Sequence, residues 1–143
     1  MAYRVLLASL AFYAVASPAL AQSCGSAPIA PALPTAAEMA QKTPAAATAA
    51  KHDAFAEVKN WQGDLKTYRD CLNGMVNQDK RQLEGLDPKK DADKIARLQT
   101  DGKAANHAYD ATVDMEEKVV NEFHAIQASF CARKDVDKSS CPK

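Results

Sequence analysis

Apolar residues recur at spacings of three and four along two long stretches of the chain. Over residues 43–84 the recurring positions are Phe55, Val58, Trp61, Leu65, Tyr68, Leu72 and Met75. Over residues 87–133 the positions of the stripe, which include the polar Thr112 and the charged Glu116, are Ile95, Leu98, Gly102, Ala105, Tyr109, Thr112, Glu116, Val119, Phe123, Ile126 and Phe130. This spacing places the residues of each stretch on one face of a helix. The pattern therefore predicts two long amphipathic helices.

Capping residues mark where these helices begin and end. Thr43-Pro44 combines an N-cap residue with a proline at the first helical position, so the first helix is expected to begin there. Gly85 is expected to end it in a left-handed conformation, and Asp87-Pro88 to cap and open the second helix. A turn near residue 87 makes the helices antiparallel. We predict an all-α fold, a long, coiled-coil-like antiparallel helical hairpin over residues 44–134, followed by a tail over 135–143.

Two residues disturb the stripes. Asp79 occupies a position of the first stripe where an apolar residue is due. Gly102 lies within the second helix, where glycine costs about 1 kcal/mol relative to alanine. A three-helix arrangement, with the second helix broken at Gly102, is therefore the alternative to the hairpin.

The segment before the first helix, residues 22–43, is rich in proline and alanine. Pro28, Pro31 and Pro34 recur every third residue, which is the repeat of a polyproline II helix. Thr35 and Glu38 have the spacing of a capping box, which predicts a short helical turn. We expect an extended strap that lies across the two helices.

Residues 1–21 have the three parts of a secretory signal peptide. Arg4 provides positive charge, residues 5–16 form a short uncharged stretch, and Ala19-Leu20-Ala21 presents small residues before the expected cleavage site. A membrane-spanning helix needs roughly 20 apolar residues, and no stretch of the chain approaches that length. The sequence predicts export to the periplasm or secretion, with no membrane span.

The mature chain contains four cysteines, Cys24, Cys71, Cys131 and Cys141. An even number of cysteines in an exported protein indicates two disulfides. In the hairpin, about 40 Å of helix separates Cys71 from Cys131, so these two cannot bond. Cys141 reaches back only about 25 Å from the end of the second helix, which disfavours a bond to Cys71. The predicted disulfides are Cys24–Cys71 and Cys131–Cys141.

Three short elements of the mature chain occur together. They are Pro28-x-x-Pro31-x-x-Pro34, Tyr68-Arg69-Asp70-Cys71-Leu72, and a closing helix with Asn106-His107, Val113-Asp114-Met115-Glu116 and Asn121-Glu122-Phe123. This combination resembles a group of uncharacterised small exported proteobacterial proteins. The resemblance implies the helical architecture and the Cys24–Cys71 pair, and it implies no activity.

Charge and candidate chemistry narrow the function only a little. With 18 basic and 18 acidic residues the chain is close to neutral, which argues against nucleic acid as a partner. No group of residues forms a recognisable catalytic motif, and we expect neither an enzyme nor a cofactor. His52, Glu122 and His124 would meet at the open end of the hairpin, where they are candidates for a weak metal site, although no metal site is the main expectation.

These observations favour a non-enzymatic periplasmic or secreted protein with a structural or protein-interaction role. Its partner would be an unknown protein or a second copy bound through the apolar stripe. One alternative is a weak divalent-metal or small-ligand binder at the open end of the hairpin. The other is a lipid-anchored envelope component attached through Cys24.

Overall fold

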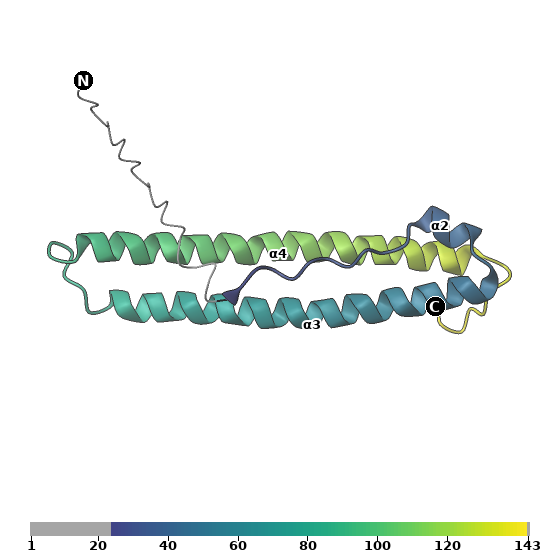
Figure 1. The fold of residues 1–143 in the computed structure, drawn as a ribbon, viewed down its shortest axis with the longest axis horizontal. Helices are drawn as coiled ribbons and strands as arrows, with labels where there is room; N and C mark the ends of the chain where they lie inside the picture. Colours follow the sequence, from purple (N-terminus) through teal and green to yellow (C-terminus); the bar gives the residue numbers. More distant parts are fainter. Residues whose placement is uncertain (1–23, 143) are drawn as a thin grey trace, which may run out of the picture.

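A computed structural model describes residues 24–142, and the predicted signal peptide lies outside this range. Within it the chain is helical and has no strand: α2 spans Ala36–Gln41, α3 spans Pro44–Leu83 and α4 spans Ala92–Ala132. The two long helices pack side by side along their length, and α2 lies against one end of the pair (Figure 1). The predicted all-α class is therefore confirmed.

Both predicted helix starts before residue 50 have the expected caps. The Thr35 hydroxyl accepts a hydrogen bond from the Glu38 backbone N–H, and the Glu38 carboxylate accepts one from the Thr35 N–H, which completes a capping box at α2. The Thr43 hydroxyl accepts from the Ala46 N–H at 3.3 Å, with Pro44 at the first position of α3. Each cap satisfies backbone donors that a helix leaves free at its start.

The predicted start of the second helix is wrong by four residues. The Asp87 carboxylate accepts hydrogen bonds from the backbone N–H groups of Lys89 and Lys90, at 2.8 and 3.2 Å. These bonds stabilise a turn over residues 88–90, and α4 begins only at Ala92. An aspartate before a proline can cap a turn as well as a helix, because both present free N–H groups two and three residues later.

Gly85 differs from expectation, whereas Gly102 agrees with the predicted continuous second helix. Gly85 does not adopt a left-handed conformation; within residues 24–142 the positive φ belongs to Gly25 alone, at 73°. Gly102 does not break the second helix, because α4 runs without interruption through it. The three-helix alternative with a break at that residue is therefore wrong.

The buried residues of the long helices follow a seven-residue repeat. In α4 they include Leu98, Ala105, Thr112, Val119 and Ile126. In α3 they form two series, Ala47, Ala54 and Trp61, and Lys51, Val58, Leu65 and Leu72. Most of the predicted stripe is thus buried within the chain, although Phe55 is 52% exposed.

Contacts between the two helices fix which residues face one another. The Phe55 ring lies 5.9 Å from the Phe123 ring, measured between centroids. Arg69, further along α3, donates a hydrogen bond to Thr112, which comes earlier in α4. Later positions of α3 therefore meet earlier positions of α4.

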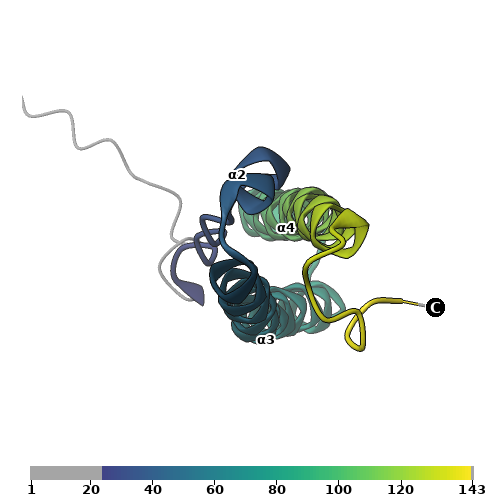
Figure 2. The same ribbon diagram turned by 90° about the vertical axis from the view of Figure 1, so that its right-hand side faces the viewer.

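Residues 24–35 form a strap along the helix pair (Figures 1 and 2). The Trp61 indole N–H donates to the Pro28 carbonyl at 3.3 Å, and Ala30 and Leu33 pack against buried residues of the two helices. The strap therefore covers apolar surface that the two helices alone leave open. Ile29, between these anchors, is 92% exposed.

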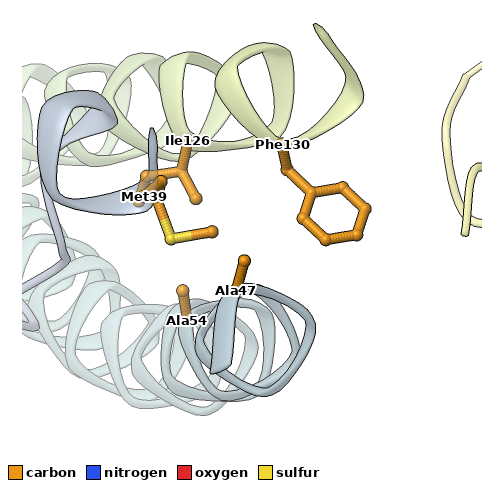
Figure 3. Close-up of a cluster of buried hydrophobic side chains, with 5 residues drawn as sticks. All are labelled: Met39, Ala47, Ala54, Ile126 and Phe130. Carbon is orange, nitrogen blue, oxygen red and sulfur yellow. The ribbon is translucent and has the colours of Figure 1, made fainter. Parts of the chain in front are cut away.

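At one end of the pair, α2 closes the core. Met39 is fully buried and lies between Ala47 and Ala54 of α3 and Ile126 and Phe130 of α4 (Figure 3). The Arg133 guanidinium donates to the carbonyls of Met39 and Lys42, which satisfies acceptors left free at the end of α2. Six helical residues are too few to be stable alone, so this packing is what holds α2.

Within residues 24–142 two disulfides join Cys24 to Cys71 and Cys131 to Cys141, which are the pairs expected from the sequence. They indicate an oxidising compartment, either extracellular or periplasmic. A lipid anchor on Cys24 would need the same sulfur that is bonded here to Cys71. Among the described helices, none is long and apolar enough to cross a membrane.

Candidate functional site

A hollow of about 270 Å³ lies where α3, α4 and the C-terminal tail meet. Its walls are mostly apolar. They comprise Lys51, His52 and Phe55 from α3, Phe123 and Gln127 from α4, and Ser140 from the tail. Positions one turn apart on each helix contribute to it, so the helical repeat itself aligns these side chains.

Lys51 is the unusual member of this wall, because its side chain is only 8% exposed. Its ammonium donates to the Ser140 carbonyl and hydroxyl oxygens, both at 2.8 Å, and lies 4.6 Å from the centroid of the Phe130 ring. Burial lowers the pKa of Lys51 below its ordinary value. Among residues 24–142, no carboxylate lies within ion-pair distance of this ammonium.

An aromatic pair forms the other wall of the hollow. The Phe55 and Phe123 rings are tilted by 44° to each other, and Phe55 is 52% exposed. Phe123 also packs against the buried residues below it. The hollow therefore combines an apolar aromatic surface that water can reach with a buried positive charge.

The tail reaches the hollow because Cys141 is bonded to Cys131 at the end of α4. Cys141 and Val136 also pack against the cluster that contains Met39 and Phe130. These contacts hold Ser140 over Lys51, although the two residues are 89 positions apart in the sequence.

The three candidate metal ligands do not come together. His52 lines the hollow, whereas Glu122 lines a shallow depression formed with Asp114, Glu117 and other residues of α4. His124 is exposed and lines neither of these two surfaces. Over residues 24–142 no three His, Cys, Asp or Glu side chains are grouped so that they could hold a metal ion.

A second polar cluster crosses the contact between the long helices. Arg69 donates through Nε to the Thr112 hydroxyl at 2.8 Å and through Nη1 to the Glu116 carboxylate, and its guanidinium lies over the Tyr109 ring. Gln62 donates to the other Glu116 oxygen at 2.8 Å. The bond from Arg69, with the bond from Gln62, lowers the pKa of Glu116. This cluster fixes the register of α3 against α4.

A third polar feature lies at Asp79 on α3. One carboxylate oxygen of Asp79 is buried without a hydrogen-bond partner in the described part of the chain. It borders a hollow of about 210 Å³ lined by residues that include Val76, Leu83, Leu98 and Gly102. Burial, and to a lesser extent the nearby Asp101 carboxylate, raises the pKa of Asp79.

Sequence reasoning missed Lys51, although a signal for it exists. Buried positions of α3 run 47, 51, 54, 58, 61 and 65, so position 51 lies on the buried face. A lysine at such a position is either paired or lies beside a site that uses its charge. The pairing with Ser140 depends on the fold of the tail, which the helix pattern does not show.

Comparisons with known proteins give no further lead, since no protein-family model, curated protein or solved structure matches this chain.

Proposed function

We propose that this chain is an exported, non-enzymatic protein that acts as a rigid helical rod with a structural or protein-interaction role in the periplasm or outside the cell. Its core is an antiparallel, coiled-coil-like hairpin. The observation that carries the proposal is the pairing of two helices, of 40 and 41 residues, in one fixed register. At 1.5 Å per residue, such helices are about 60 Å long.

Several features support the hairpin as a rod of fixed length. The seven-residue repeat of buried positions is typical of coiled-coil packing. The cluster around Arg69 and Glu116 opposes sliding, because a shift of either helix would separate a partly buried ion pair. Each disulfide ties a non-helical segment back onto a long helix.

The outer surface offers apolar residues to a partner. The side chain of Ile29 on the strap is 92% exposed, and that of Val113 on α4 is 44% exposed. Because most of the stripe is buried, we place the interaction on these outer residues. Self-association through the stripe at Phe55, which is 52% exposed, remains the alternative.

Intact mass spectrometry of protein recovered from a bacterial envelope tests export. We expect a chain that begins at Gln22 and has four thiols that react with an alkylating reagent only after reduction. A chain that retains residues 1–21, or that has reactive thiols before reduction, would overturn the exported, disulfide-tied part of the proposal.

Site-specific photo-crosslinking in cells tests the interaction role. A photo-reactive amino acid at Ile29 or Val113 should give a discrete crosslinked band, identified by mass as a second copy or as another protein. The control places the same photo-reactive amino acid at Asn77, an exposed polar position of α3, where it should give no crosslinked band. Equal labelling at all three positions would argue against a specific interaction surface.

A further inference from the structure

The Lys51 ammonium is a buried positive charge whose partners within residues 24–142 are all neutral. Its two hydrogen-bond acceptors are oxygens of Ser140, and its third neighbour is the Phe130 ring. A cation at a buried position is normally compensated by an anion, since neutral acceptors replace only part of the lost hydration. Among residues 24–142 these two acceptors leave the third ammonium N–H without a hydrogen-bond partner.

The hollow beside this charge has the size and lining of a small-ligand site. An apolar cavity of about 150 Å³ is large enough for benzene. The hollow at Lys51 measures about 270 Å³, which leaves room for a ring with a short polar arm. Because the rings of Phe55 and Phe123 are tilted to each other, an aromatic ligand can contact them through both its edge and its face.

We propose that this hollow binds a small aromatic monocarboxylate, whose carboxylate pairs with Lys51 and whose ring packs against Phe55 and Phe123. The inference goes beyond the proposed structural role. Charge complementarity selects an anion, because His52 and Lys51 are the titratable groups in the wall and neither is acidic. The side-chain amide of Gln127 provides a further donor at the rim.

Calorimetric titration with phenylpropionate, compared with the neutral alcohol phenylpropanol, tests this site on the full mature protein. We expect the wild-type protein to bind the carboxylate at least about tenfold more tightly than the alcohol, which is the size of one charged hydrogen bond. Lys51→Met should remove this preference and leave binding of the alcohol unchanged. Phe55→Ala should weaken the binding of both compounds.

Two controls separate recognition from folding. Lys59→Met removes a lysine from an exposed position of α3 outside the hollow and should leave both affinities unchanged. Ser140→Ala keeps the charge but removes the hydroxyl that occupies one ammonium N–H, so it should bind phenylpropionate at least as tightly as the wild type. This second variant tests the site even if Lys51→Met does not fold.

Three results would overturn the inference. They are equal affinity of the wild-type protein for the two compounds, no binding of either at millimolar concentration, and loss of phenylpropionate binding in Ser140→Ala while circular dichroism shows intact helices.

Discussion

Single side chains at the contact between α3 and α4 show how polar residues can strengthen a helical rod. Arg69 and Glu116 are 16% and 27% exposed, so much of their hydration is lost. Bonds to each other, to Thr112 and to Gln62 compensate part of the lost hydration, while Arg69 Nη2 is buried without a hydrogen-bond partner among residues 24–142. When one partner of such a cluster is removed, the others remain desolvated and unpaired.

Arg69→Met is therefore expected to lower the free energy of unfolding by about 2 kcal/mol. Urea denaturation followed by circular dichroism measures this change. Lys66→Met is the matched control, because the Lys66–Asp70 pair on the same helix is exposed to solvent and should contribute nothing measurable. Equal stability of Arg69→Met and the wild type would show that the cluster does not lock the register.

The same cluster predicts an acid-dependent loss of stability. The pKa of Glu116 is lowered in the folded protein, so the folded state binds this proton less readily than the unfolded state does. Its stabilising contribution is complete above the ordinary pKa of about 4.5 and is lost as the pH falls through the lowered value. Glu116→Gln should therefore flatten the decline of stability in acid, as measured by urea denaturation across that range.

For Asp79 we expect the opposite dependence of stability on pH. Its pKa is raised, so the ionised form destabilises the folded protein at neutral pH and the penalty disappears as the pH falls towards 3.8. Asp79→Leu should raise the free energy of unfolding by about 1 to 2 kcal/mol at about pH 7. Asp79→Asn, which removes only the charge, should give a smaller gain that vanishes at about pH 4. A gain from Asp79→Asn that is the same at both pH values would contradict this account.

At the scale of elements, the sequence predicts helix interiors better than helix ends. Thr43-Pro44 and the box at Thr35 and Glu38 are local signals, because each cap bonds to a backbone N–H three residues away. The start of α4 is harder to predict, since the Asp87 carboxylate has the same local donors in a turn as in a helix. The position of Ser140 over Lys51 depends on a contact 89 residues away, which no helical spacing encodes.

The glycines inside the helices are a further test at this scale. Gly74 lies in α3 at an exposed position, and an added Cβ would meet no atom within 4 Å. Gly74→Ala should therefore stabilise the protein by about 1 kcal/mol. Gly25→Ala is the contrasting variant, because φ at Gly25 is positive and alanine is strained there. Thermal melts of the two variants should move in opposite directions.

At the scale of the whole molecule, the strap and the tail are bound to the long helices by one disulfide each. The two bonds span 47 and 10 positions of sequence. On the chain-entropy model they contribute about 4 and about 3 kcal/mol to stability. The strap also covers Trp61, the one tryptophan of the chain.

Replacing Cys24 and Cys71 by serine should release the strap and expose Trp61. We expect a red shift of tryptophan emission and a loss of about 4 kcal/mol of stability, with helical circular dichroism retained at low temperature. Replacing Cys131 and Cys141 by serine is the matched control. It should leave the emission of Trp61 unchanged, because that bond lies in the tail. Identical spectra for both variants would mean that the strap does not depend on its disulfide.

The order of the two disulfides also bears on how the protein matures. Each bond joins neighbouring cysteines in the sequence, the first to the second and the third to the fourth. A chain that enters an oxidising compartment amino end first would present Cys24 and Cys71 before Cys131 and Cys141. An oxidant that closes each pair as it emerges produces the native connectivity directly. Maturation of this protein is therefore expected to require a thiol oxidase but no disulfide isomerase.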